Sequence, residues 1–182
     1  GASLGAVTLV GGSLTGNGTM AQLIGGPGTV APGNSVGQLV VTGTTTLAGA
    51  TYAAEIDPGN SNADLLVVNG ADLTGGTLTV TSLNGAPAVG QTFTVMRGTG
   101  IVGVFGSVVY TDSFPGVTPS VQYSETDVRV VYAAATVVTP GKATPVPTIS
   151  QWGLVLLALA LGWLAGRKQN IYVRELSVQS SL

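Results

Sequence analysis

The side chains best suited to chemistry lie together in residues 57 to 64, which read Asp-Pro-Gly-Asn-Ser-Asn-Ala-Asp. Asp57, Asn60 and Asp64 bring oxygen atoms close together in the chain, and Ca²⁺ prefers hard oxygen ligands of this kind. The spacing matches neither an EF-hand loop nor a repeated calcium-binding coil. The alternative is a solvated turn, because Asp and Asn side chains bond to nearby backbone in turns. We therefore expect no metal site, with these three residues as the weak candidates.

Other groups that could do chemistry are scarce. The sequence has no His and no Cys, which excludes a Ser-His-Asp triad, a cysteine nucleophile and Cys-containing metal sites. Glu55 and Asp57 could form a carboxylate pair for acid–base work, since positions i and i+2 of a strand share a face. They could equally be the acidic end of a strand. We expect no enzymatic activity and no cofactor.

A second segment combines a short motif, an apolar stretch and a basic pair. In order, the segment holds Val146, Pro147, Thr148, Ile149, Trp152, Gly153, the apolar stretch, Arg167 and Lys168. Residues 149–166 carry no charge, and as a helix they would be about 27 Å long, close to the thickness of a bilayer core. Trp residues near both ends favour the interfaces, and the basic pair favours the cytoplasmic side. The pattern predicts a transmembrane helix, with a buried helix of a soluble domain as the alternative.

The order of these residues resembles the IPTL-CTERM sorting signal of Gram-negative bacteria, whose usual form is Ile-Pro-Thr-Leu, two variable residues and Trp-Gly. Four positions match that form directly: Pro147, Thr148, Trp152 and Gly153. Val146 stands for the Ile, and Ile149 stands for the Leu. The resemblance implies recognition by an exosortase-like membrane protease-transpeptidase, cleavage near the motif and transfer to the cell surface. As a departure from the family pattern, the chain continues for residues 169–182 after the basic pair.

Charge is sparse and unevenly divided along the chain. Charged residues make up 8% of the sequence, against about 25% in average soluble proteins. Residues 1–134 carry two Arg against seven Asp or Glu, a net charge of −5. A negative region with so few Arg is not typical of nucleic-acid-binding proteins. We expect no nucleic acid among the partners.

Residues 1–134 are rich in Gly, Thr and Val, a composition that favours strands and tight turns. Short strands are expected at residues 6–10, 14–19, 38–42, 44–48, 51–56, 64–68, 77–81, 92–96, 107–111, 120–124 and 127–132. Within residues 1–30, the pairs Gly11-Gly12 and Asn17-Gly18 are expected to mark tight turns. Residues 77–81 read Thr-Leu-Thr-Val-Thr and would place apolar side chains on one face. Short strands separated by glycine turns fit either a solenoid or a β-sandwich. The bias towards small residues at the turns favours the solenoid.

Roughly residues 11–132 also resemble the C-terminal passenger repeat of bacterial autotransporters. The segments that carry the resemblance are residues 31–35, 52–57, 64–68 and 90–94. The resemblance implies a right-handed parallel β-helix and says little about activity.

These observations predict an all-β chain with one C-terminal helix. The expected parts are a right-handed parallel β-helix over residues 1–134, a linker with the start of the motif over 135–148, a transmembrane helix over 149–166, and a cytoplasmic basic stop and tail over 167–182. A β-sandwich with the same helix is the alternative fold. We expect the β domain to be part of a longer one, with a signal peptide ahead of it in the full protein.

The predicted function is that of an exported cell-surface protein, structural or adhesive. The expected route is an inner-membrane intermediate with its C-terminus in the cytoplasm, followed by the cell surface or the medium. Expected partners are an exosortase-like enzyme, the inner membrane through the helix, and a surface polysaccharide. Tyr110, Phe114 and Tyr123 could stack on sugars or pack in the core. The alternatives are a permanently anchored display protein and the C-terminal part of a β-helical carbohydrate-active enzyme.

Overall fold

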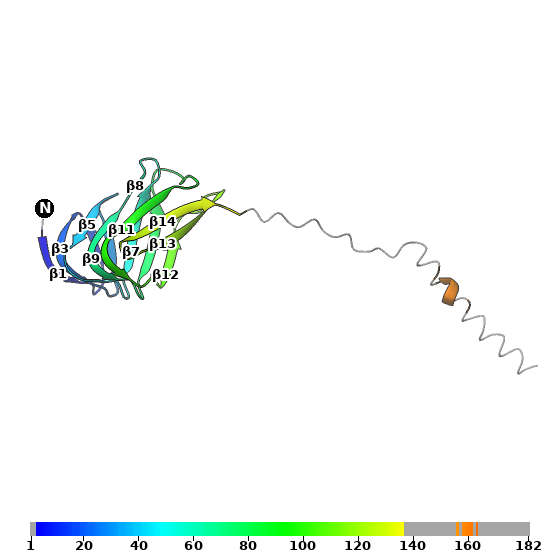
Figure 1. Ribbon diagram of the computed structural model, residues 1–182, viewed down its shortest axis with the longest axis horizontal. Helices are drawn as coiled ribbons and strands as arrows, with labels where there is room; N and C mark the ends of the chain where they lie inside the picture. The colour runs from blue at the N-terminus through cyan, green and yellow to red at the C-terminus, as the bar shows by residue number, and fades with distance from the viewer. Residues whose placement is uncertain (1–2, 137–155, 157, 162, 164–182) are drawn as a thin grey trace, which may run out of the picture. The chain divides into compact units, whose positions relative to one another are not determined.

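The computed structural model describes residues 3–136, 156, 158–161 and 163. The chain divides into two units, Gly1–Val137 and Val138–Leu182. The first unit is mostly β, with its strands arranged in one mixed and one largely parallel sheet (Figure 1). The expectation of an all-β domain is therefore confirmed for the described part of this unit.

The larger sheet has eight strands in the order β1-β3-β5-β9-β11-β14-β13, with β6 pairing to both β3 and β9. Its strands are β1 (Ser3–Thr8), β3 (Gly18–Ile24), β5 (Gln38–Val41), β6 (Thr45–Thr46), β9 (Leu65–Asp72), β11 (Thr92–Val102), β13 (Val117–Tyr123) and β14 (Asp127–Ala134). Figure 1 shows β1 beside the N-terminus at one end of this unit, and β13 and β14 towards the other end.

The smaller sheet has six strands in the order β12-β10-β7-β4-β2, with the short β8 pairing to β7. Its strands are β2 (Ser13–Gly16), β4 (Thr29–Pro32), β7 (Thr51–Asp57), β8 (Asn62–Ala63), β10 (Thr77–Ser82) and β12 (Ser107–Tyr110).

The chain passes repeatedly from one sheet to the other and adds a strand to each. In the smaller sheet, one in-register row joins successive passes and consists of Ser13, Thr29, Thr51, Thr77 and Ser107. All of these pairs are parallel, whereas β-sandwiches of the immunoglobulin kind are built from antiparallel sheets. Apart from the antiparallel pairing of β8 with β7, the strands from β1 to β12 pair with one another in parallel, unlike the strands of that kind of sandwich.

A parallel β-helix implies parallel pairing, and the structure departs from this where the short β8 pairs with β7 and at the C-terminal end of the unit. There β14 pairs antiparallel with both β11 and β13. The short connection between β13 and β14 explains the change, because a tight turn can join only antiparallel neighbours. Ser124 holds that turn by donating its N–H to the carbonyl of Asp127 at 2.9 Å and accepting from the N–H of Asp127 at 2.9 Å.

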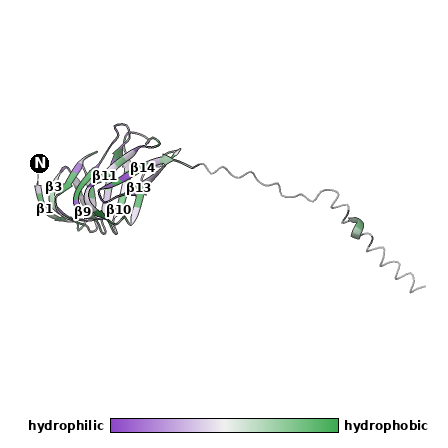
Figure 2. Cartoon of the chain, viewed as in Figure 1, coloured by the Kyte–Doolittle hydropathy of each residue, from purple (hydrophilic) through white to green (hydrophobic). Residues whose placement is uncertain are grey.

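The core lies between the two sheets and follows from the alternation of side chains along the strands. Residues 77–81 alternate between half-buried Thr and buried Leu78 and Val80, as expected. Figure 2 shows hydrophobic and hydrophilic residues mixed along the same strands. Tyr52 is fully buried, and its hydroxyl donates to the carbonyl of Val95, which links the two sheets through the core.

Several strand boundaries differ from the sequence-based expectation. Residues 14–19 are divided into β2 and β3 at Asn17, where the Asn-Gly pair was expected to mark a turn, and Oδ1 of Asn17 accepts the N–H of Gln38 at 2.7 Å. The predicted strand at 44–48 is reduced to Thr45–Thr46, and the one at 92–96 extends to Val102. These ends depend on hydrogen bonds from other passes of the chain, which local composition does not reveal.

In the second unit, residues 156, 158–161 and 163 are helical. No helix within the described part of the chain has the length and apolar character needed to span a bilayer. The other residues of the predicted span 149–166 lie outside the described residues. The transmembrane helix therefore stays a prediction.

Candidate functional site

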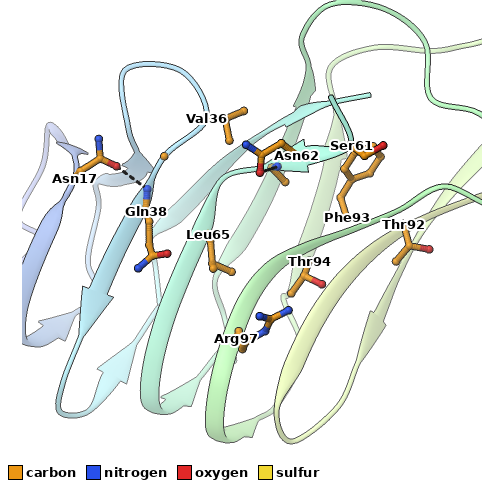
Figure 3. A pocket seen from close by; sticks show the side chains of 12 residues that line it. Asn17, Val36, Gln38, Ser61, Asn62, Leu65, Thr92, Phe93, Thr94 and Arg97 are labelled. Atoms are coloured by element: carbon orange, nitrogen blue, oxygen red, sulfur yellow. Dashed lines mark hydrogen bonds between the residues drawn. The ribbon is translucent and has the colours of Figure 1, made fainter. Parts of the chain in front are cut away.

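A groove of about 550 Å³ crosses the outer face of the larger sheet where β5 and β9 begin. Figure 3 shows Gln38, Leu65 and Thr94 following one another across neighbouring strands, with Ser61 and Asn62 along one side. The side chains that give the groove its polar character are Asn17, Gln38, Ser61, Asn62, Thr94 and Arg97. Leu65 is the neighbour of Gln38 in the sheet and provides an apolar contact on the floor.

A β-bulge in β11 brings Thr94 and Arg97 to the same face. The register between β11 and β14 shifts between Thr94 and Met96, and Val95 and Met96 are both buried. Because an extra residue in one strand reverses the alternation, side chains three positions apart then share a face. The bulge thus directs Arg97 into the groove rather than into the core.

Arg97 is the charged side chain of the groove lining. Its Nε donates to Oδ1 of Asp127 at 3.4 Å, and the same carboxylate accepts from Nη2 of Arg129 at 2.9 Å. The Arg97 side chain is 61% exposed, against 16% for that of Asp127. Two guanidinium groups sharing one carboxylate leave a local excess of positive charge, and Arg97 presents it to the groove.

One wall of the groove is the turn that follows β7, and Asp57 holds it in place. Its carboxylate accepts from the N–H of Asn60 at 3.3 Å, the side-chain amide of Asn60 at 2.7 Å and that of Asn84 at 3.2 Å. Chiefly because of the Asn60 amide, the pKa of Asp57 lies below its ordinary value. Asp57 therefore remains an anionic acceptor that fixes the turn.

Ser61 lies at the end of this turn and has a φ of 52°, which is unusual for a residue other than glycine. The amide nitrogen of Gln91 reaches it from a later pass of the chain, donating to the carbonyl of Pro58 at 2.9 Å and to the Ser61 hydroxyl at 3.3 Å. The surrounding hydrogen bonds thus hold Ser61 in a strained conformation at the edge of the groove.

Asp64 supports the groove from below. Its side chain accepts the N–H of Gly37 at 2.7 Å and the N–H of Glu55 at 2.9 Å, and only 1% of Asp64 is exposed. Burial raises its pKa from 3.8 to about 6, although both N–H donors act in the opposite direction. Since Gly37 lines the groove, Asp64 positions that part of the lining.

The calcium candidates thus have structural roles in two separate hydrogen-bond networks. Asp57 and Asn60 bond to each other, whereas Asp64 bonds to backbone N–H groups of other segments. N–H donors occupy the oxygen atoms that a cation would need. Within the described residues, no group of three or more His, Cys, Asp or Glu could hold a metal ion. The turn interpretation describes this segment, except that Asp57 and Asp64 are buried rather than solvated.

The aromatic candidates for sugar stacking contribute to packing. Tyr110 and Tyr123 pack against the core cluster, and the rings of Tyr123 and Phe105 lie 6.3 Å apart. Burial accordingly raises the pKa of both tyrosines. Phe114 is half-buried. Of the two uses expected for these rings, packing is the one seen for Tyr110 and Tyr123.

Sequence reasoning did not find the groove. Asn17, Gln38, Ser61 and Arg97 lie 20 to 80 residues apart and meet only because successive passes place them side by side. Residues 92–97 did contain a signal for part of the groove. Strict alternation would bury Arg97, so the sequence itself indicates a bulge that turns this side chain outwards.

The residues of the predicted sorting motif lie outside the described residues: Val146, Pro147, Thr148, Ile149, Trp152 and Gly153, together with Arg167 and Lys168. Residues 144–169 match the IPTL-CTERM motif. The motif implies export, surface sorting and processing by an exosortase-like enzyme. A comparison with curated proteins found no match. The comparisons give no support to the resemblance with autotransporter passengers, which stays a prediction.

Proposed function

We propose that this chain is a structural or adhesive protein of the bacterial cell surface, delivered there by exosortase-type processing of its C-terminal segment. The match of residues 144–169 to the IPTL-CTERM motif is the observation that carries the proposal. Before processing, residues 149–166 hold the chain in the inner membrane as a helix, with residues 167–182 in the cytoplasm. This orientation is supported by the uncharged stretch and by Arg167 and Lys168 after it.

The displayed part is a right-handed parallel β-helix closed at one end by an antiparallel hairpin. The parallel pairing of successive passes from β1 to β12 supports the helix, and β13 and β14 form the hairpin. The right hand follows from the strong preference for right-handed crossovers between parallel strands. Such a domain buries its apolar side chains between sheets and leaves long faces open for contact with other molecules.

The direct test is the intact mass and C-terminal peptide map of the protein from its native producer, compared between membrane and surface fractions. We expect the surface form to end near Val146 to Ile149. A surface form that still contains Glu175 to Leu182 would contradict processing and would indicate a permanently anchored display protein.

A pair of proline variants tests whether the motif itself is recognised. Pro147→Ala alters the proline of the four-residue form Val146–Ile149, whereas Pro145→Ala makes the same change one residue before that form, although still within the matched range 144–169. We expect the first variant to accumulate as the full-length chain in the membrane fraction and the second to be processed normally. Equal processing of both variants would mean that another feature of the segment directs sorting.

A further inference from the structure

We propose that the groove on the larger sheet binds an extended acidic oligosaccharide, with Arg97 taking a uronate carboxylate and Gln38 and Thr94 binding sugar hydroxyls. The inference rests on the proposed function in one respect, since display outside the cell is what would expose the groove to such polymers.

The first support is a set of polar groups that the protein itself does not use. Among the described residues, the side-chain amide of Gln38 and the hydroxyl of Thr94 have no hydrogen-bond partner. Asn62 uses only its Oδ1, which accepts the N–H of Ala63 at 3.0 Å. Arg97 donates only through Nε. Several donors and acceptors therefore converge on one groove without internal partners, as is typical of ligand sites.

The second support is the chemistry of these groups. Amides and hydroxyls both donate and accept hydrogen bonds, and sugar hydroxyls do the same. Leu65 adds an apolar contact between Gln38 and Thr94, which suits the C–H face of a sugar ring. A ligand with many hydroxyls can replace the water that these exposed amides otherwise bind.

The third support is the spacing of the groups. Gln38, Leu65 and Thr94 belong to three neighbouring strands, β5, β9 and β11. Neighbouring strands lie about 4.8 Å apart, so a chain lying across the strands meets a new side chain at each step. An extended polymer with a short repeat suits this arrangement better than a compact ligand.

The preference for an acidic sugar comes from Arg97. A guanidinium group binds a carboxylate through two parallel hydrogen bonds, and the Nη groups of Arg97 have no partner among the described residues. Asp127 does not cancel its charge, because Arg129 shares that carboxylate. Arg97 is therefore the charged side chain that a ligand in the groove would meet, within a domain of net negative charge.

The turn after β7, which forms one wall of the groove, is fixed by hydrogen bonds from another pass of the chain. Ser61, at φ 52°, is fixed by Gln91, and Gln91 also accepts the N–H of Ala88 at 3.0 Å. Strained residues that the surrounding structure holds in place are concentrated at functional sites.

The test measures binding of tetragalacturonate and of neutral maltotetraose to the purified full-length chain by isothermal titration calorimetry. Arg97→Met removes the groove charge. Arg129→Met is the matched control, because it removes the other arginine bonded to Asp127 and lies outside the groove lining. We expect the uronate to bind, Arg97→Met to weaken that binding at least about tenfold, and Arg129→Met to weaken it by a clearly smaller factor, because Arg97 stays in the groove while Asp127 then offsets more of its charge.

Gln38→Ala provides a second variant that keeps the charge. We expect it to weaken uronate binding while its thermal melting stays close to that of the unaltered chain, because Gln38 is exposed. Absence of uronate binding, equal binding of the neutral sugar, or equal losses in the two arginine variants would each overturn the proposal. The assay uses the purified chain and does not depend on processing. If this chain binds the uronate but the surface form in the native producer still contains Glu175 to Leu182, only the sorting proposal is contradicted.

Discussion

Asp64 joins separate passes of the chain through its carboxylate, and its burial makes the stability of the fold depend on pH. Its folded pKa of about 6 lies above the ordinary 3.8, so the folded chain takes up this proton at a higher pH than the unfolded chain does. The resulting stability is fully present below about pH 3.8 and is lost as the pH rises through about 6. Lowering the pH from about 7 to about 5 should therefore raise the free energy of unfolding by about 1 kcal/mol from this group.

Urea denaturation at a series of pH values measures this effect. Asp57, Asp72 and Asp112 have lowered pKa values and titrate below the window between about pH 5 and 7. The Asp64→Asn variant should lose the rise between about pH 7 and 5, whatever its overall stability. A rise of unchanged size in that variant would assign the effect to another group.

Gly33 occupies a position that only glycine can fill without rearrangement. Its φ is +85°, and a Cβ there would lie 2.2 Å from the carbonyl oxygen of Ser35. We expect Gly33→Ala to lower the free energy of unfolding by about 2 kcal/mol or more, since backbone strain and a steric clash add together.

Gly70→Ala is the control for the strain alone. Gly70 has a φ of +81°, but a Cβ there would meet nothing within 4 Å. This variant should cost only about 1 kcal/mol in the same thermal or urea denaturation. Equal costs at the two positions would show that the loop around Gly33 relaxes to make room.

At the level of elements, β14 covers the C-terminal end of the core with one face only. Val128, Val130 and Tyr132 are buried, whereas Val131 between them is half-buried on the other face. Val130→Thr keeps the shape of the side chain but buries a hydroxyl among apolar groups, which costs roughly 1–3 kcal/mol. Val131→Thr makes the same change on the outer face and should stay within about 0.5 kcal/mol of the parent.

Thermal denaturation of both variants gives the comparison. Because the two residues are neighbours in one strand, differences in β-propensity cancel and only the face differs. Similar losses in both variants would mean that β14 does not hold a fixed face against the core.

The strands were more predictable from sequence than their directions. Residues 77–81 alternate strictly, so their face could be assigned before the structure was known. Alternation is the same in parallel and antiparallel strands, however, and the reversal of β14 depends on the short connection after β13. The strand at 92–96 was expected, but the bulge inside it was not, because alternation counted from Thr92 would expose Met96 and bury Arg97.

The residues around the groove likewise separate into those that local sequence could identify and those that depend on how the strands pair. Asp57, Asn60 and Asp64 were selected because they are close in sequence, and the structure assigns them to hydrogen bonds that hold the walls. The side chains that face the groove come from different passes of the chain. No single segment of the sequence contains that set, so only the pairing of the strands could reveal it.

At the scale of the whole molecule, the stability of the β-rich unit and the destination of the chain depend on different segments. The core of Gly1–Val137 is built from side chains of its own strands and connections, from Leu9 to Tyr132. The motif that implies sorting lies in residues 144–169. Changes in the second segment should therefore alter location without altering the melting of the first.

Leu157→Arg tests the predicted membrane span near its middle. A charge at the centre of a bilayer costs roughly 2.5–3.5 kcal/mol on insertion scales, so the variant should leave the membrane fraction of cells that lack the processing enzyme. Gln169→Arg adds the same charge beyond the basic pair and should remain in the membrane fraction. Continued fractionation of Leu157→Arg with membranes would mean that residues 149–166 do not span the bilayer, and that the motif is presented to its processing enzyme in another way.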